Sequence, residues 1–292
     1  DGIDLSVPAG EIFGLLGPNG AGKTTTISIC TTRALPSGGA VSIAGIDVVR
    51  HPSRARVHLG VVPQYNTLDR ALTIFENLYY HCRYFGFPRQ RAGERSRELL
   101  AQFQLLERES AYPSELSGGL QQRIQIARAI AHRPSVLFLD EPSAGLDPQS
   151  RIAMWDAVRA LRSEGITIVL TTHYMEEADV LCDRVAIVDK GRILALDTPQ
   201  QLKKTLGTGT LLELRLRDLD RAPELLPLLV ALDQVDKAER TPQGVRLFAR
   251  HTEGLLARVV PAAEPFGLRD LSIQEPSLET VFIRLTGREL RD

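Results

Sequence analysis

The sequence is poor in cysteine, and it lacks a long apolar run. The 292 residues include three cysteines, Cys30, Cys82 and Cys182, which are odd in number and widely spaced. This argues against a disulfide framework and against a zinc site, so a reducing, cytoplasmic compartment is expected. The longest apolar run, residues 225–232, contains Pro227, whereas a membrane span needs about 18 apolar residues. We therefore expect no transmembrane segment, and no signal peptide is visible after Asp1.

The sequence also lacks an excess of charge of either sign. Thirty-five basic and thirty-six acidic residues leave a net charge of −1, so neither a nucleic-acid surface nor a membrane-binding patch is expected. Hydrophobic residues make up 43% and charged residues 24%, which is typical of folded globular chains. At roughly 150 residues per domain, the length predicts about two domains.

The first 200 residues alternate short β-type runs with helical patterns, which predicts parallel βαβ units and an α/β fold. The run at residues 135–139 is almost wholly apolar, as expected of a central strand covered on both faces. A turn at residues 189–192 predicts a hairpin. The predicted strands are residues 11–16, 57–62, 135–139, 166–171, 184–188 and 192–196.

Residues 73 to about 133 interrupt this alternation with a helical stretch, which we expect to be a helical subdomain inserted in the sheet domain. Thr73 and Glu76 form a capping box that predicts a helix ending near Gly86. The mixed charges of residues 89–98 favour a solvated helix face.

A second, smaller domain is expected after Gly207. The order of predicted strands and helices from Leu211 onward is βαββαβ, followed by a last helix from Ser277, which suggests a small α+β domain. We therefore predict an α/β sheet domain at residues 1–206 and an accessory α+β domain at residues 207–292. The last helix has an apolar face of Leu278, Val281, Phe282 and Leu285, for which a core role is favoured over a partner-binding role.

A phosphate-binding loop is predicted at residues 17–24. Gly-Pro-Asn-Gly-Ala-Gly-Lys-Thr follows a strand and precedes a helix, which is the context that supports such a match. The glycines let backbone N–H groups face a phosphate, and the helix N-terminus adds partial positive charge. Lys23 is expected to reach the phosphates and Thr24 to hold Mg²⁺. The chain has five lysines and thirty arginines, and Lys23 is the only lysine before Lys190, so a compact ammonium stands where a point charge on phosphate is needed.

Two carboxylates follow the apolar strand at residues 135–139. In α/β sheets, ligands bind at the carboxyl ends of the strands. Asp140 is therefore expected to contribute to the magnesium site. Glu141 is expected to be the general base that takes a proton from attacking water.

A second helix start resembles the signature motif of ABC-type ATPases. Residues 116–122 read Leu-Ser-Gly-Gly-Leu-Gln-Gln, and a Ser-Gly-Gly helix N-terminus can bind an anion. The resemblance covers the first 206 residues with its motifs in the family's order. It implies a P-loop NTPase (RecA-like) sheet domain that binds ATP and Mg²⁺. The expected nucleotide contacts are Asn19, Gly20, Gly22, Lys23, Thr24, Thr25, Ser117, Gly118, Gly119 and Asp147.

Three further residues take their roles from the same resemblance. Gln64 is similar to the Q-loop glutamine, which touches Mg²⁺ and water, so the implied metal site is Thr24, Gln64 and Asp140. Asp147, at the end of Ser143-Ala-Gly-Leu-Asp, looks like the D-loop residue at a dimer interface. His173 looks like the switch histidine, so the implied catalytic set is Glu141, His173 and Gln64. The other histidines form no recognisable set and are interpreted as surface or structural.

The end of the chain narrows the resemblance. Residues 275–289 are similar to the ending of ATP-binding subunits of ABC-2 type exporters, the daunorubicin/doxorubicin-resistance group. Family members stack an aromatic residue on adenine from a strand that lies upstream of Asp1, so no residue of this sequence is assigned that role.

The resemblance implies an ATPase that powers export through a separate integral membrane permease of the ABC-2 type. It would pair head to tail as an ATP-sandwich homodimer at the cytoplasmic face of the membrane. Two alternatives stay open. A soluble ABC ATPase acting on ribosomes or DNA would be expected to carry two cassettes, a coiled-coil insertion or a zinc module. A non-catalytic scaffold would be expected to lack Glu141 or His173.

Overall fold

The computed structural model describes residues 2–205, 210–249, 254–274 and 277–287. The chain forms two compact units, the first ending at Leu196 and the second beginning at Asp197. The boundary predicted at residues 206–207 lies later in the chain and falls outside the described residues.

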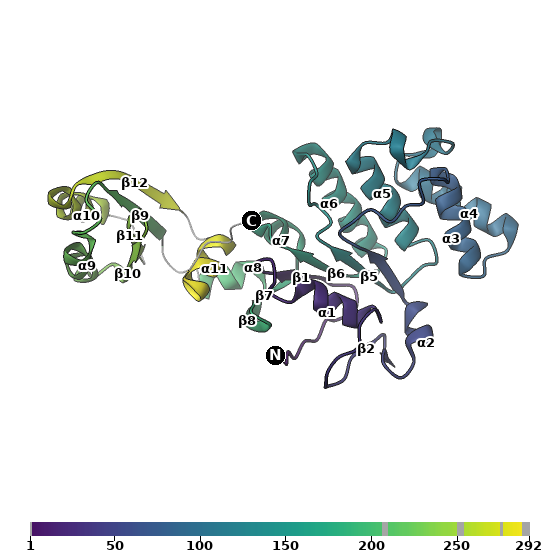
Figure 1. Cartoon of the computed structure of the whole chain (residues 1–292), viewed down its shortest axis with the longest axis horizontal. Coiled ribbons are helices and arrows are strands. Elements are labelled where there is room, and N and C mark those ends of the chain that lie inside the picture. The colour runs from purple at the N-terminus through teal and green to yellow at the C-terminus, as the bar shows by residue number, and fades with distance from the viewer. Residues whose placement is uncertain (1, 206–209, 250–253, 275–276, 288–292) are drawn as a thin grey trace. The chain divides into compact units, whose positions relative to one another are not determined.

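The first unit is built on a six-stranded sheet with the order β4-β5-β6-β1-β7-β8 (Figure 1). The pairs β4–β5, β5–β6, β6–β1 and β1–β7 are all parallel, and β5 lies inside the sheet, as its apolar sequence predicts. The strands are β1 (Ile12–Leu16), β4 (Leu59–Val62), β5 (Val136–Asp140), β6 (Thr167–Thr172), β7 (Arg184–Asp189) and β8 (Arg192–Asp197). A two-residue hairpin pair, β2 (Ser42–Ile43) and β3 (Ile46–Asp47), was not expected.

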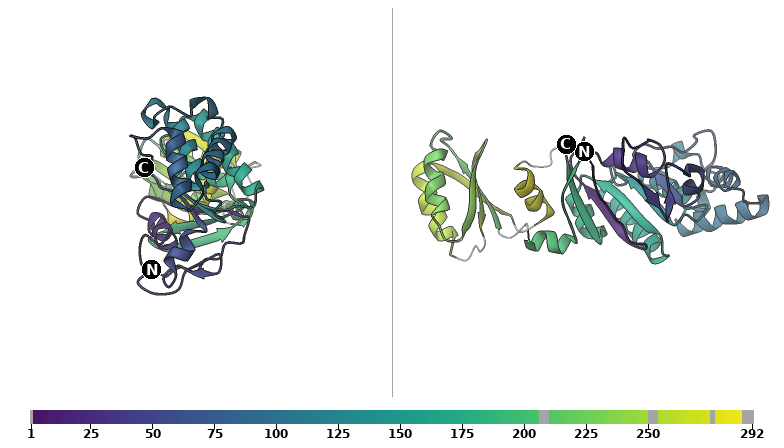
Figure 2. Two further views of the ribbon diagram at one scale, coloured as in Figure 1. Left: turned by 90° about the vertical axis from the view of Figure 1, so that its right-hand side faces the viewer. Right: turned by 90° about the horizontal axis from the view of Figure 1, so that it is seen from below.

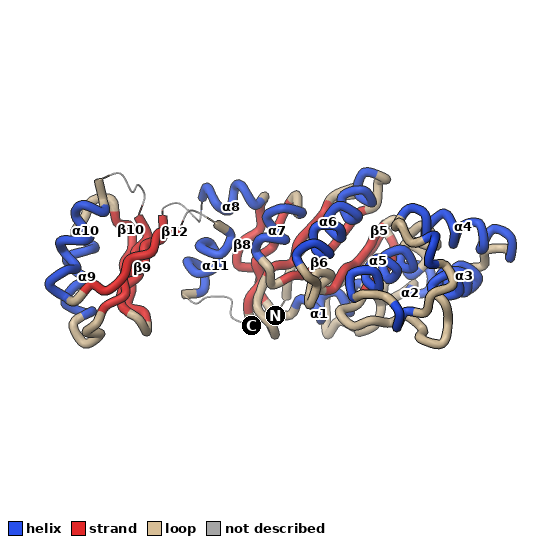
Figure 3. The backbone as a smooth tube through the Cα atoms, turned by 90° about the horizontal axis from the view of Figure 1, so that it is seen from above, coloured by secondary structure: helices blue, strands red, loops and turns tan. Residues whose placement is uncertain are grey.

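Helices cover both faces of this sheet. The helices of the first unit are α1 (Lys23–Cys30), α2 (Pro52–Arg56), α3 (Ile74–Tyr84), α4 (Arg89–Gln102), α5 (Gly118–Ala129), α6 (Pro148–Ser163) and α7 (Met175–Leu181). Helix α1 lies on one face, and α6 and α7 lie on the other (Figures 1 and 3). Side chains of β1 alternate between the two faces, and Phe13 and Leu15 pack in one buried cluster with Ala21 and with Ile27 of α1. The sheet is thus the middle layer of three.

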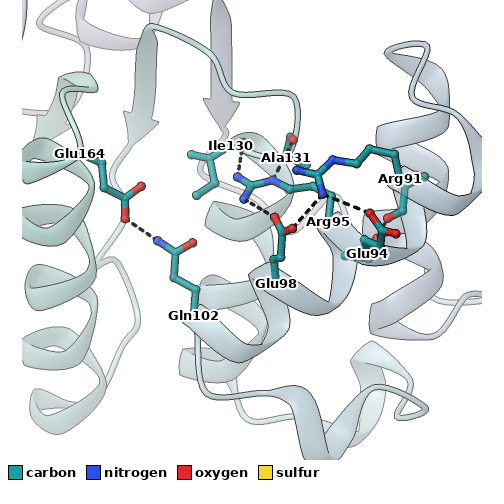
Figure 4. A network of polar contacts seen from close by, with 10 residues as sticks. Arg91, Glu94, Arg95, Glu98, Gln102, Ile130, Ala131 and Glu164 are labelled. Atoms are coloured by element: carbon teal, nitrogen blue, oxygen red, sulfur yellow. Dashed lines mark hydrogen bonds and ion pairs between the residues drawn. The ribbon is translucent and has the colours of Figure 1, made fainter.

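The predicted helical subdomain consists of α3, α4 and α5. Thr73 caps α3 and makes both capping-box bonds with Glu76, as expected. On α4 the charged residues predicted to be solvated form ion pairs with one another. Arg95 also bonds outside its own helix. Its guanidinium donates to the carbonyl oxygens of Ile130 and Ala131 at 3.4 and 3.3 Å (Figure 4). The arginine therefore satisfies carbonyl groups at the C-terminal end of α5, where a positive charge is favoured.

The second unit contains a four-stranded antiparallel sheet with the order β10-β11-β9-β12. Its elements are β9 (Thr210–Leu216), α9 (Ala222–Val230), β10 (Val235–Thr241), β11 (Gly244–Ala249), α10 (Leu256–Ala263) and β12 (Leu268–Gln274). Helices α9 and α10 pack on one face of the sheet (Figure 2). This βαββαβ arrangement is a ferredoxin-like fold.

Two more helices, α8 (Pro199–Thr205) and α11 (Leu278–Thr286), belong to the second unit and contact each other. Ile283 of α11 packs in a buried cluster with Leu211 of β9 and Phe248 of β11. The buried face of α11 comprises Leu278, Val281, Phe282 and Ile283, whereas the predicted Leu285 is half-buried. No helix in the described parts of the chain has both the length and the apolar character that a membrane span requires.

Candidate functional site

The loop between β1 and α1 has a backbone that requires glycine at two positions. Gly22 caps α1 with φ at 105°, a left-handed conformation that favours glycine. A Cβ atom on Gly17 would lie 2.1 Å from the carbonyl oxygen of Val188, so a larger residue does not fit. Gly17 also donates from its backbone N–H to the carbonyl oxygen of Thr172 at 3.3 Å. The loop is therefore fixed to β6 and close to β7, with α1 starting directly after it.

Lys23 is buried at the start of α1, with 5% of its surface exposed. Its ammonium donates to the carbonyl oxygens of Gly17 and Pro18 at 2.7 and 3.0 Å and lies 3.5 Å from Glu141 Oε1. Burial lowers the pKa of Lys23, and the charges of Glu141 and Asp140 oppose this shift. The lysine thus joins the loop to the carboxylates.

Asp140 ends β5 and accepts two hydroxyl groups on one oxygen. Thr171 Oγ1 of β6 donates to Asp140 Oδ1 at 2.6 Å, and Thr24 Oγ1 of α1 donates to it at 3.3 Å. The register of the sheet places Asp140 directly beside Thr171. Thr24 and Asp140, which were predicted to share a metal, are therefore neighbours.

Glu141 is the centre of the site. Its Oε2 accepts from Gln64 Nε2 at 3.0 Å and lies 3.3 Å from His173 Nδ1. Its backbone has a φ of 50°, a left-handed conformation that costs about 1–3 kcal/mol for a residue other than glycine. The N–H group of Glu141 donates to Thr171 Oγ1 at 3.0 Å, which holds this conformation in place.

The segment after Gln64 is bonded to α5. Thr67 donates from its N–H to Gln125 Oε1 at 3.1 Å, and its carbonyl oxygen accepts from Arg128 at 2.7 Å. Asn66 also bonds to Gln121 of α5. The glutamine that touches Glu141 is therefore connected to the helix that begins at Ser117.

The second predicted anion site lies at the start of α5. The Ser117 hydroxyl caps the helix by accepting from the N–H of Leu120 at 3.5 Å. Ser117 and Gly118 are exposed, and Gly119 is half-buried. A Cβ atom on Gly119 would lie 2.3 Å from Ser150 Oγ, so α6 passes close to this helix start. Helix α5 thus presents its N-terminus to solvent, where an anion is favoured.

Asp147 is exposed and caps α6. Its carboxylate accepts from the N–H of Ser150 at 2.9 Å and from the Ser150 hydroxyl at 2.6 Å. These bonds lower the pKa of Asp147, the hydroxyl contributing most. In this chain Asp147 therefore acts as a helix cap.

The structure brings together most of the residues that the sequence singled out. Lys23, Thr24, Asp140, Glu141, Gln64 and His173 meet at the carboxyl ends of β1, β4, β5 and β6. Asn19, Gly20 and Thr25 are exposed next to Lys23 in the chain. Sequence reasoning missed Thr171, although the two threonines at the end of its strand were a visible signal.

The sequence and the fold are similar to those of known ATP-binding proteins. Residues 1–144 match the family described as ABC transporter. Over 98% of its length the chain is 40% identical to the daunorubicin resistance ATP-binding protein DrrA2 of Streptomyces coeruleorubidus, and it covers 90% of that protein. It is equally identical, over its full length, to the Nod factor export ATP-binding protein I of Ralstonia nicotianae, again covering 90%. Among solved structures, cbiO1 of Clostridium perfringens, part of an ABC transporter complex, shares 26% identity and a TM-score of 0.65, with 70% of this chain and 83% of that one covered.

Proposed function

Because the chain belongs to the ABC transporter family of ATP-binding proteins, we propose that it hydrolyses ATP to power export through a separate membrane permease. The meeting of Lys23, Asp140, Glu141 and His173 at one edge of the sheet carries this proposal. Two similar proteins are named for daunorubicin resistance and for Nod factor export, so an exported small molecule is the expected cargo. The chain would then act at the cytoplasmic face of the membrane.

The loop of residues 17–22 and Lys23 bind the phosphates in this proposal. Backbone N–H groups and the N-terminus of α1 favour negative charge. The Lys23 ammonium donates to the carbonyl oxygens of Gly17 and Pro18 within this loop, and it would donate to phosphate oxygens when the nucleotide binds. Asn19, Gly20, Gly22, Thr24 and Thr25 complete the contacts.

Oxygen donors suited to Mg²⁺ are present beside this loop. Thr24 Oγ1 and Asp140 Oδ1 are hydrogen-bonded to each other, and Gln64 reaches the same group of residues through Glu141. One or two protein oxygens together with substrate phosphates are the usual magnesium ligands. The bound ion would neutralise phosphate charge, while Asp140 is held in place by Thr171.

Glu141 is the proposed general base. Its carboxylate lies within reach of Gln64, His173 and Lys23, so it can accept a proton from a water that Gln64 orients. His173 would contact the terminal phosphate. Charged groups positioned around the reacting phosphate are the main source of catalysis in this class of reaction.

Ser117, Gly118, Gly119 and Asp147 are proposed to act on the partner's nucleotide in a head-to-tail homodimer. The exposed N-terminus of α5 supports this proposal, because it is a second anion-binding helix start separate from that of α1. Each nucleotide would then lie between the Lys23 loop of one subunit and the Ser117 helix of the other.

The test is the substitution Glu141→Gln in the full chain. We expect the variant to bind ATP and to hydrolyse it at least about a hundredfold more slowly, because it has lost the general base. The surface variant Glu94→Gln serves as the control. Phosphate release measures the rate of ATP hydrolysis. Light scattering with and without MgATP reports dimerisation, and the slow variant should accumulate as a dimer in the presence of MgATP. A Glu141→Gln turnover near that of the wild type would exclude the base role, and a monomer in the presence of bound ATP would contradict the dimer.

A further inference from the structure

Glu177 is a fully buried carboxyl group outside the residues discussed so far. It lies in the first turn of α7 with 0% of its surface exposed. Trp155 of α6 donates from its indole Nε1 to Glu177 Oε1 at 3.2 Å. A buried acid is costly unless it is neutral or paired, so its place in the fold requires an explanation.

The surroundings of Glu177 come from three other parts of the first unit. Burial raises its pKa, and the side chains of Thr172, Ser143 and Trp155 together with the charge of Arg151 oppose this shift. In the described part of the chain, Glu177 Oε2 and Ser143 Oγ are buried without a well-formed hydrogen bond. A neutral carboxyl group carries one proton that it can donate to such a hydroxyl oxygen.

These neighbours flank the reacting residues. Ser143 follows Glu141 by two positions, Thr172 directly precedes His173, and Glu141 and His173 lie 3.3 Å apart. We propose that Glu177 is a positioning residue that ties the Ser143 segment to the Thr172 segment and thereby sets the approach of His173 to Glu141. The proposal rests on the ATP hydrolysis proposed above, but its test also has a readout that does not need turnover.

Two variants test this role: Glu177→Ala removes the carboxyl group, and Glu177→Gln replaces it with an amide of similar size. Removing the carboxyl group should lower kcat for ATP about tenfold or more while KM changes less than about threefold, because the lost contact acts on the reacting geometry and not on ATP binding. Glutamine keeps the size, accepts from Trp155 and donates to Ser143, so it should restore kcat to within about threefold of the wild type. Glu176→Gln, the exposed neighbour on the same helix, is the matched control and should match the wild type.

Trp155 supplies a direct spectroscopic readout, because it is the only tryptophan of the chain. MgATP should change its emission in the wild type and in Glu177→Gln, and this change should be lost in Glu177→Ala. A chain without ATPase activity would contradict the proposed function while leaving this readout intact. Wild-type kcat and emission in a folded Glu177→Ala variant would overturn the positioning role. Equal losses in kcat and ATP affinity, with a lowered melting temperature, would overturn it in favour of a purely structural role.

Discussion

The Thr171 hydroxyl holds both acidic residues of the site. It donates to Asp140 Oδ1 at 2.6 Å and accepts from the N–H of Glu141 at 3.0 Å. Thr171 is fully buried, so water cannot replace it in either bond. This side chain therefore contacts both a carboxylate proposed to hold Mg²⁺ and the backbone of the proposed base, whose N–H group also donates to the Thr171 carbonyl oxygen at 3.1 Å.

Replacing this hydroxyl by a methyl group should weaken both functions. We expect Thr171→Val to lose about 1–3 kcal/mol of stability, because it removes two hydrogen bonds worth about 0.5–1.5 kcal/mol each. It should also need more Mg²⁺ for half-maximal ATPase activity. Thr171→Ser keeps the hydroxyl and is the matched control. Urea unfolding and magnesium titration of the rate measure the two effects, and a valine variant that behaves like the serine variant would disprove the assignment.

Sequence motifs were sufficient to single out the candidate residues that lie in local patterns. Lys23 sits in a recognisable loop, and Asp140 and Glu141 follow an apolar strand. The roles of Thr171 and Glu177 depend on strand register and helix packing across the sheet. Such contacts join residues far apart in the chain, so no local pattern contains them.

Helix starts with side-chain caps were the elements that sequence placed best. Thr73, Ser117 and Ser277 cap α3, α5 and α11 as their sequences predict. Helix α10 begins at Leu256, behind Leu255, which has no side-chain cap. A helix that is held only by tertiary packing gives no local start signal.

Helix α3 is joined to the end of α5 and to β4 by a cluster of rings. His132 stacks on Phe85 with ring centroids 3.8 Å apart and bonds through Nε2 to the carbonyl oxygen of Leu59 at 3.0 Å. His81 lies 5.7 Å from His132 and 5.0 Å from Phe85. Burial lowers the pKa of His81 to about 3 and that of His132 to about 4. Both histidines are therefore neutral at pH 7.

This cluster predicts a loss of stability in weak acid. The pKa values in the folded state lie below the ordinary value of 6.5, so the unfolded chain takes up protons first as the pH falls. The contribution of the two neutral histidines to stability is complete above about pH 6.5, and it is lost as the pH falls from there to about pH 4 for His132 and about pH 3 for His81. His81→Phe keeps the ring packing and should flatten the fall in melting temperature between pH 7 and 4.5, whereas the exposed His51→Gln should not. Melting temperatures that fall equally with pH in the wild type, His81→Phe and His51→Gln would contradict this account.

At the scale of the molecule, the division into an α/β unit and a smaller α+β unit follows from the order of strands and helices. The residue at which the two units divide does not follow from that order. Helix α8 reads as the end of the first domain, yet it contacts α11 within the second unit, and its Leu202 is buried. Helices α8 and α11 lie near opposite ends of the second unit's sequence, so the sequence around α8 could not reveal their contact.

We propose that the first unit folds and binds nucleotide alone. Residues 1–196 should melt cooperatively, and MgATP at about a hundred times its Kd should add about 2.7 kcal/mol. For a domain of this size that corresponds to a shift of roughly 5–10 °C in melting temperature. Residues 1–207 should melt less cooperatively, because α8 is retained without α11. Calorimetry measures both, and an insoluble shorter fragment would refute the proposal.

The place of β1 in the sheet has a consequence for protein synthesis. Its neighbours β6 and β7 begin at residues 167 and 184, so the strand that leads into the phosphate loop emerges from the ribosome long before its partners exist. At about 5–20 residues per second the wait is roughly 8–30 s. During that time an apolar strand stays unpaired in the nascent chain. This strand is thus made early but is among the last to be incorporated, and chaperone binding should concentrate on nascent chains that end before about residue 170.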